Sequence, residues 1–222
     1  MAAVCSLNNR SRILLKDGTY QMQGEPTEAA LKVLAEKIGK LHGKYDHSKQ
    51  PMAHFDSFAQ TVNDVAVLDF SSERKCMSTV VTGYEGNSAN TVLLKGAPER
   101  VIEMCSTVLS ASGETSSLSE AQKAGLISEV KKVSSEGYRV LGIAIGLDGG
   151  NMKHITKANT SEELTDISGY TKMESNCSFV GYVCIKDPVR PEVKGAIDEC
   201  RRAGINVIMI TGDAKETAVS IA

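Results

Sequence analysis

A run of β-branched and apolar residues, 206–210, ends abruptly in Thr211, Gly212 and Asp213. A short apolar run followed by turn residues is typical of a strand buried on both faces of a parallel sheet. A helical pattern begins at once, so the polar tripeptide would lie between a strand end and a helix N-terminus. Ligands bind at this edge of open α/β sheets, and the backbone N–H groups there suit an anion such as phosphate. The run therefore predicts a phosphate-side loop at residues 211–213.

The bulk composition excludes several classes of function. The 222 residues carry a net charge of −2 and are 41% hydrophobic, which indicates a globular protein and gives no reason to expect nucleic acid as a partner. No apolar run approaches the ~18–20 residues of a membrane span, so we expect this chain itself to be soluble. The six cysteines have no C-x-x-C spacing, which favours reduced thiols. We expect His42, His47 and His54 to be surface histidines and predict no metal site, because their spacing fits no compact metal cluster.

Most of the chain has the pattern of an α+β domain. Apolar runs separated by tight turns predict an antiparallel sheet, with strands at 65–70, 77–81, 91–95, 139–147 and 178–185. Asp17-Gly18 favours an additional hairpin near the start. We expect one helix capped by Thr27 and ended by Gly39, a second that begins at Pro98, and a third capped by Ser119. Residues 40–63 are expected to be mostly loop or a weak helix. The Ser/Thr-rich stretch up to 118 and residues 148–176 are expected to be loops.

The pattern changes after Asp187. Residues 190–203 have the apolar spacing of an amphipathic helix, and the buried run at 206–210 follows. A helix followed by a buried strand is the arrangement of a doubly wound parallel sheet. Because proline disfavours helix at the preceding residue, Asp187-Pro188 marks the boundary. We therefore predict an α+β domain with an antiparallel sheet flanked by helices over 1–186, and part of a doubly wound α/β domain over 187–222.

Four separated motifs stand in a fixed order along the chain. They are Pro-Thr-Glu-Ala at 26–29, Phe70 with Arg-Lys-Cys-Met-Ser at 74–78, Lys-Gly-Ala-Pro-Glu at 95–99, and Asp-Pro-Val-Arg at 187–190 with Met-Ile-Thr-Gly-Asp at 209–213. The set resembles the cytosolic part of a P-type cation pump, and within that family the sarcoplasmic/endoplasmic reticulum-type calcium pumps most closely. The resemblance implies a nucleotide-binding domain over 1–186 and part of a haloacid dehalogenase-like phosphorylation domain over 187–222.

The resemblance also implies roles for individual residues. Phe70 matches the aromatic that stacks on adenine, and Glu28 with Thr27 the contact to the adenine edge. The implied phosphate and pocket contacts are Lys75, Lys95, Gly96 and Arg139, the hinge residues are Asp187 and Arg190, and the catalytic phosphate-side loop is Thr211, Gly212 and Asp213. These residue types suit the task, because aromatic stacking contributes roughly 1–3 kcal/mol per base and lysines neutralise phosphate.

The sequence departs from the family at three places. Ser72 stands where these pumps usually carry an arginine near the phosphates, and Ala214 replaces the usual Asn after Thr-Gly-Asp. Ser6-Leu7-Asn8 is looser than the Asn-Asp that usually follows the early cysteine.

The implied activity is ATP hydrolysis coupled to cation transport, of Ca²⁺ by resemblance, through an aspartyl-phosphate and with ATP and Mg²⁺. The D-K-T-G-T and G-D-G-x-N-D motifs of the family are not in this sequence. We therefore expect this chain alone to bind ATP weakly and not to turn it over. Its partners would be the missing transmembrane and actuator parts of the same pump, at the cytosolic face of the endoplasmic reticulum or a related internal membrane.

Two other hypotheses remain open from the sequence. One is a stand-alone nucleotide-binding or regulatory module with no pump attached. The other is a soluble phosphatase of the haloacid dehalogenase class, because the Thr-Gly-Asp strand is similar to that fold. The phosphatase would need an aspartate nucleophile on an earlier strand, and no predicted strand here ends in D-x-D or D-K-T.

Overall fold

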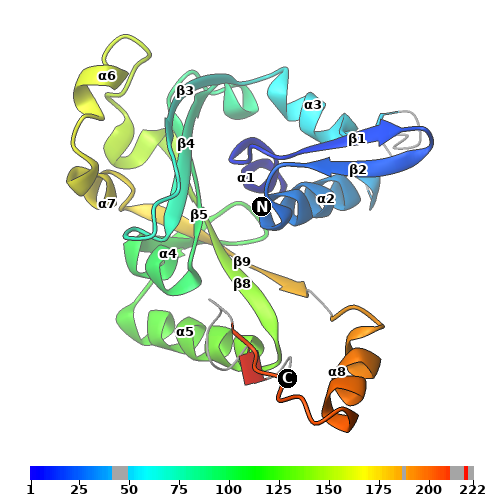
Figure 1. The fold of residues 1–222 in the computed structure, drawn as a ribbon. Coiled ribbons are helices and arrows are strands. Elements are labelled where there is room, and N and C mark those ends of the chain that lie inside the picture. The colour runs from blue at the N-terminus through cyan, green and yellow to red at the C-terminus, as the bar shows by residue number, and fades with distance from the viewer. Residues whose placement is uncertain (42–49, 187–188, 211–217, 220–222) are drawn as a thin grey trace.

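A seven-stranded mixed sheet forms the centre of the molecule, with the strand order β3-β4-β5-β8-β9-β6-β7 (Figure 1). The computed structural model describes residues 1–41, 50–186, 189–210 and 218–219. The strands are β3 Asn63–Leu68, β4 Cys76–Thr82, β5 Thr91–Gly96, β6 Cys105–Leu109, β7 Thr115–Ser117, β8 Tyr138–Gly146 and β9 Cys177–Lys186. Every neighbouring pair is antiparallel except β6 and β9, which are parallel. The predicted α+β fold, an antiparallel sheet flanked by helices, is confirmed, with β6 and β9 as a parallel pair that the sequence did not indicate. The loop expected up to residue 118 was wrong, because β6 and β7 lie in that stretch.

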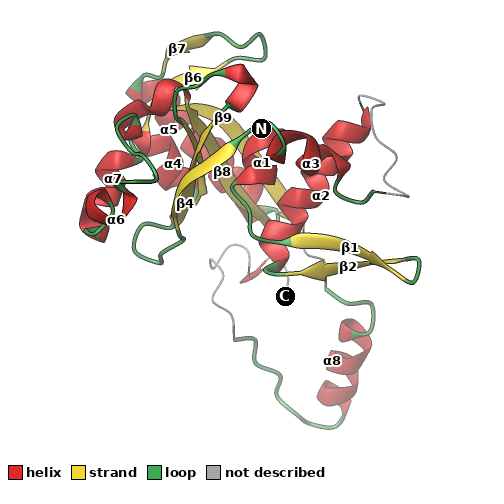
Figure 2. Ribbon diagram, turned by 90° about the horizontal axis from the view of Figure 1, so that it is seen from above, coloured by secondary structure: helices red, strands yellow, loops and turns green. Residues whose placement is uncertain are grey.

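Helices cover both faces of this sheet (Figure 2). On one face, α1 (Ala2–Leu7) and α2 (Pro26–Leu41) bury an apolar cluster that includes Val4, Leu31 and Leu93. On the other face, α4 (Pro98–Met104) and α5 (Glu120–Ser135) cover the larger cluster. Burial of apolar side chains on both faces is what makes the central strands continuous hydrophobic runs in the sequence.

A separate hairpin, β1 (Arg12–Lys16) and β2 (Thr19–Gln23), precedes α2. Its two turn residues, Asp17 and Gly18, have φ values of 50° and 74°. Positive φ at both central residues is the type I′ geometry that matches the twist of a two-residue hairpin. The hairpin predicted from Asp-Gly is therefore confirmed.

Two of the three helix starts predicted from the sequence are confirmed. Pro98 is the first residue of α4, and Ser119 forms a capping box with Gln122 at the start of α5. The prediction that Thr27 caps α2 was wrong, because the helix already begins at Pro26. Gly39 does not end the helix either. A Cβ on Gly39 would lie 2.5 Å from the ring of His54, so the glycine lets α3 (Ala53–Ala59) approach α2.

His54 is not the surface residue that we expected. Its Nδ1 lies 2.7 Å from the carbonyl oxygen of Ala35, and the side chain is only partly exposed. The other two histidines of that stretch, His42 and His47, lie outside the described residues.

Residues 147–176 are not a surface loop. They form the short helical segments η2 (Leu147–Met152), α6 (Thr160–Glu163), η3 (Ile167–Gly169) and α7 (Tyr170–Met173), and a further turn, η1 (Tyr84–Gly86), lies between β4 and β5. Met152 and Ile155 are fully buried in the larger cluster. Asn90 holds the segment in place by donating to the carbonyl oxygens of Met152 and Ile155, both at 2.8 Å. Single helical turns are too short to leave a period in the sequence, which explains the wrong prediction.

In the C-terminal region the helix α8 (Val193–Arg202) lies away from the sheet (Figure 1). Val193, Ile197 and Cys200 form a half-buried stripe on it, but Ala196 is exposed. The strand predicted at 206–210 is absent, and Ile208 and Ile210 are 80% and 93% exposed. A strand requires a hydrogen-bonding neighbour, and no described residues pair with this segment. The division into domains at 186/187 stays a prediction.

Among the helices of the described residues, none combines the length and the apolar character that a bilayer crossing requires.

Candidate nucleotide-binding site

The sequence-predicted site residues of the first domain gather at one edge of the sheet. Adjacent antiparallel strands bring the end of β3, the start of β4 and the end of β5 together, as the pairing of Cys76 with Gly96 shows. Phe70 and Lys75 lie in the connection between β3 and β4, and Lys95 and Gly96 close β5. Gly96 pairs with Gly142 of β8, so Arg139 lies three residues further along that strand, about 10 Å beyond.

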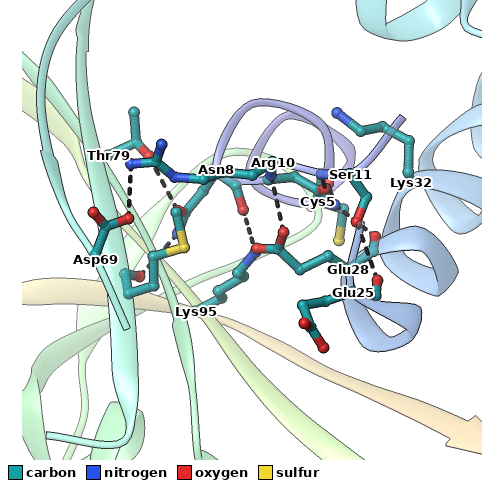
Figure 3. Close-up of polar contacts among 12 residues, drawn as sticks. Cys5, Asn8, Arg10, Ser11, Glu25, Glu28, Lys32, Asp69, Thr79 and Lys95 are labelled. Atoms are coloured by element: carbon teal, nitrogen blue, oxygen red, sulfur yellow. Dashed lines mark hydrogen bonds and ion pairs between the residues drawn. The ribbon is translucent and has the colours of Figure 1, made fainter. Parts of the chain in front are cut away.

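Lys95 and Glu28 form the centre of this edge (Figure 3). The Lys95 ammonium lies 2.6 Å from Glu28 Oε1 and also donates to the carbonyl oxygen of Asn8. Only 7% of Lys95 is exposed, and burial lowers the pKa of its ammonium, an effect that the carboxylate of Glu28 opposes. Lys95 shares a strand face with Leu93, so it points towards α1 and α2. The structure therefore brings Glu28 and Lys95 together as a nearly buried ion pair, and their contacts with a nucleotide stay a prediction.

Asn8 is a residue of this site that the sequence reasoning missed. Its amide donates to the carbonyl oxygens of Met77, at 2.9 Å, and Leu93, at 3.0 Å. Its Oδ1 accepts from the Thr79 hydroxyl at 3.0 Å. The side chain thus joins β4 and β5, while its backbone carbonyl holds Lys95. The only sequence signal was its place after the early cysteine, which we treated as a weak match to the family.

Arg10, also missed, connects the ion pair to the loop that carries Phe70. Its backbone N–H donates to Glu28 Oε2 at 3.0 Å, and its guanidinium lies 2.7 Å from Asp69 (Figure 3). Both charged side chains are largely exposed, so this ion pair contributes little to stability. It places the Arg10 guanidinium beside Asp69, which directly precedes Phe70.

Phe70 is 64% exposed, so it is not a core aromatic. Its neighbour Asp69 contacts Arg10, and Arg10 in turn contacts Glu28. Phe70 is thus an exposed aromatic residue, and the residue before it belongs to a cluster of charged groups. This arrangement suits a planar heterocycle that carries charged substituents.

Lys75 is exposed, and its backbone is fixed against the end of β5. Its carbonyl oxygen accepts from the N–H of Ala97 at 2.8 Å, and it has a left-handed φ of 55°. Gly96 is required here because a Cβ at that position would lie 2.5 Å from the same carbonyl oxygen. The structure therefore brings Lys75 and Gly96 together through the backbone and leaves the Lys75 ammonium in solvent.

Arg139 and Thr27 form the third contact of the site. Arg139 Nη1 donates to the Thr27 hydroxyl at 2.9 Å, which connects β8 to the first turn of α2. Arg190 is exposed, and within the described part of the chain its side chain makes no hydrogen bond or ion pair with these residues. Its carbonyl oxygen accepts from the Val193 N–H at 3.1 Å in the turn before α8. Asp187, Thr211, Gly212 and Asp213 lie outside the described residues.

No metal centre accompanies this edge in the part of the chain that the structure describes. There, no group of three or more His, Cys, Asp or Glu side chains is arranged to hold a metal ion. The described residues therefore do not by themselves fit a Mg²⁺ site.

Comparison with known sequences identifies the family. Residues 1–192 match the family described as P-type ATPase, cytoplasmic domain N. The chain therefore belongs to the P-type ATPase family, and its sheet with flanking helices is the cytoplasmic N domain.

Several full-length pumps resemble the whole chain. The endoplasmic reticulum-type calcium-transporting ATPase 2 of Arabidopsis thaliana is 34% identical over 235 residues, which cover 100% of this chain and 22% of the relative. The endoplasmic reticulum calcium ATPase srcA of Aspergillus fumigatus is 37% identical over 234 residues, covering 100% and 23%. A sodium/potassium exporting P-type ATPase, cta3 of Schizosaccharomyces pombe, is 36% identical over 220 residues, covering 98% and 18%. The chain thus spans about a fifth of the length of these relatives.

Proposed function

We propose that this chain binds ATP at the edge formed by Phe70, Glu28, Lys95, Lys75 and Arg139, as the nucleotide-binding part of a calcium pump. The observation that carries the proposal is the ion pair in which the Lys95 ammonium lies 2.6 Å from Glu28 Oε1. Contacts of Arg10 with Glu28 and Asp69 connect this pair to the loop that carries the exposed Phe70. A buried ion pair is not needed for stability alone, since apolar side chains of similar volume serve as well.

Each residue has a task that its position supports. The exposed face of Phe70 stacks on adenine. Glu28, already oriented by Lys95 and by the Arg10 N–H, accepts hydrogen bonds from the adenine edge, with Thr27 beside it. The Lys75 ammonium and the Arg139 guanidinium, both exposed, provide positive charge for the phosphates. Ser72 is exposed in the same loop but carries no charge, so we expect the phosphates to be held by fewer cations than in pumps with arginine there.

The nucleotide domain then delivers the γ-phosphate to an aspartate of the phosphorylation domain. The phosphate-side loop of that domain is formed by Thr211, Gly212 and Asp213. The hinge between the two domains contains Asp187 and Arg190. Domain closure around a hinge is a common way to bring such groups together. Mg²⁺ accompanies ATP in phosphoryl transfer and neutralises charge on the phosphates. The described residues provide no ligand set for this ion.

The transported ion and the membrane follow from the relatives. Two of the relatives named above are endoplasmic reticulum calcium ATPases, which supports calcium transport across that membrane with this chain on its cytosolic side. The missing transmembrane and actuator parts of the pump are its partners. Because the sequence has no D-K-T-G-T motif, this chain by itself forms no phosphoenzyme.

The direct test is a titration of this chain with a fluorescent ATP analogue, followed by displacement with ATP. Substituting Phe70→Ala removes the stacking surface, which is worth roughly 1–3 kcal/mol, so affinity is expected to fall by about 5- to 150-fold. The matched control is Tyr20→Ala, which removes an equally exposed aromatic from the β1–β2 hairpin.

Equal affinities of the two variants would contradict the assignment of Phe70. Absence of any ATP displacement from the unaltered chain would contradict the proposed function as a whole. A phosphoenzyme formed from this chain and ATP would contradict the claim that it cannot turn ATP over.

A further inference from the structure

A buried ion pair connects the loop of residues 69–75 to a distant part of the chain. Arg74 Nη1 lies 2.6 Å from both carboxylate oxygens of Glu174, which is 100 residues away in sequence. The two side chains are 4% and 0% exposed. Glu174 directly follows α7, so the pair joins the loop before β4 to the segment before β9.

The Glu174 carboxylate is held by several donors besides Arg74. It accepts from the Ser78 hydroxyl at 2.7 Å and from the Cys76 thiol at 3.3 Å, both on β4. The backbone N–H of Glu174 donates to the carbonyl oxygen of Tyr170 at 2.9 Å. A buried carboxylate with this many partners has a fixed position, and it fixes the position of Arg74 in turn.

Arg74 in turn closes the loop on itself. Its Nη2 donates to the carbonyl oxygen of Asp69, and its backbone N–H donates to the Ser71 hydroxyl at 3.2 Å. The Lys75 N–H donates to the carbonyl oxygen of Ser71 at 2.7 Å. The Arg74 guanidinium also lies 5.0 Å from the ring centroid of Tyr170. Both ends of the loop are therefore tied around one buried side chain.

The loop has one side chain that points inward and several that point outward. Arg74 is buried, whereas Phe70, Ser72, Glu73 and Lys75 are exposed. The outward residues include the two that we assign to ATP, the aromatic platform and a phosphate cation. The anchor and the proposed binding groups thus alternate along the same short loop.

We propose that Arg74 and Glu174 are positioning residues of the nucleotide site, which hold the loop of residues 69–75 so that Phe70 and Lys75 face the ligand together. This proposal rests on the proposed function, because it assigns a role within the same site. Neither residue touches the nucleotide. The pair orders the loop before ATP binds, which reduces the conformational entropy that is lost on binding.

The test removes both charges at once, with the double variant R74M/E174L. Replacing a buried ion pair by apolar side chains is often neutral for stability, so the domain is expected to stay folded. Affinity for ATP is expected to fall roughly fivefold or more, because part of the stacking on Phe70 is lost. A second variant, Arg74→Lys, keeps the positive charge. It replaces by a single nitrogen the two guanidinium nitrogens that contact Glu174 and the Asp69 carbonyl oxygen. We expect an intermediate loss of ATP affinity.

The matched control is Asn90→Ala. Asn90 is also buried and holds the same 147–176 segment, through Met152 and Ile155, but does not contact the loop. Its loss should lower the unfolding temperature and leave ATP affinity unchanged. If the ion pair only stabilised the fold, ATP affinity would instead fall together with stability in every variant, including Asn90→Ala.

Hydrogen exchange in the absence of nucleotide provides a readout that does not depend on ATP. The backbone N–H groups of residues 74 and 75 should exchange faster in the double variant than in the unaltered chain, and at an unchanged rate in Asn90→Ala. Unchanged exchange of these two amides, or unchanged ATP affinity in a folded double variant, would overturn the positioning role. If the unaltered chain binds no ATP, the proposed function fails, and the exchange rates alone decide whether the pair orders the loop.

Discussion

Gly96 and Lys75 are in such close contact that a Cβ on the glycine would lie 2.5 Å from the lysine carbonyl oxygen and 2.6 Å from Cys76 Cβ. The carbonyl also accepts the hydrogen bond of the Ala97 N–H. The end of β5 and the start of β4 are therefore joined without space for any side chain, directly beside the proposed nucleotide site.

Substituting Gly96→Ala is expected to force the two strands apart. Overpacking of this kind typically costs about 1–3 kcal/mol, measurable as a lower free energy of unfolding in urea. ATP affinity should fall with it, since Lys75 moves. In the control, Gly125→Ala within α5, nothing lies within 4 Å of the new Cβ, so the helix should become more stable by about 0.5–1 kcal/mol. A Gly96→Ala variant as stable as the control would contradict the contact.

Asn8→Ala should destabilise the domain more than a typical surface substitution. It removes the amide N–H groups that donate to the Met77 and Leu93 carbonyl oxygens, and the oxygen that accepts from the Thr79 hydroxyl. All three partner groups are buried. Each unsatisfied buried group costs about 1–3 kcal/mol, so a total near 3 kcal/mol is expected in chemical denaturation. Asn8→Asp keeps the acceptor for Thr79 but not the donors, and we expect it to be no more stable than the alanine variant.

Lys32 should make stability depend on pH in the alkaline range. It is 1% exposed, donates to the Ser6 carbonyl oxygen at 2.7 Å and lies 3.9 Å from the ring centroid of Phe55. Burial lowers the pKa of Lys32 to about 8, with Lys95 and Arg12 acting in the same direction and Glu28 and Glu36 opposing it. At Lys32 the unfolded chain therefore binds more protons than the folded one between pH 8 and about 10.5, so the contribution of this side chain to stability rises with pH there.

The measurement is the unfolding free energy of the unaltered chain relative to Lys32→Met from pH 7 to 10.5. The difference should move in favour of the unaltered chain as pH rises above about 8, by at most about 1.4 kcal/mol per pH unit. Lys37→Met, at an exposed position of the same helix, is the control and should show a flat difference. A flat difference for Lys32→Met as well would mean that its amine stays protonated in the fold.

Ser119→Ala should remove the capping box of α5. The Ser119 hydroxyl accepts from the Gln122 N–H, and the Gln122 side chain accepts from the Ser119 N–H at 2.9 Å. The expected cost is about 1 kcal/mol. Ser128→Ala, on the exposed side of the same helix, should instead be neutral or slightly stabilising. Equal effects of the two substitutions on the unfolding temperature would argue against the cap.

Local signals explain what could be predicted of the fold from the sequence. Asp17-Gly18, Pro98 and Ser119 each fix the backbone within a few residues, and all three were confirmed. Thr27 and Gly39 carry the same kind of signal but were misjudged. Their roles are set by partners far away in sequence, since Thr27 accepts from Arg139 and Gly39 faces His54.

Tertiary context explains the larger errors. The run at 206–210 has the composition of a buried strand, yet a strand forms only beside a neighbour, and among the described residues it has none. The role of Glu174 could not be predicted from the sequence for the opposite reason. It lies in a stretch without periodicity, and only the fold brings it to Arg74. For the site, the resemblance supplied the exposed residues, whereas Asn8 and Arg10 became visible only through their contacts.

The packing of α1 has a consequence for how the domain is made. Val4 and Cys5 precede every strand of the sheet, but the apolar cluster that buries them also contains Val183 of β9. During synthesis, α1 therefore cannot complete its packing until nearly the whole domain has been translated. Contacts between such distant segments slow folding and prolong the exposure of apolar surface. We expect this domain to depend on chaperones while the ribosome is still producing it.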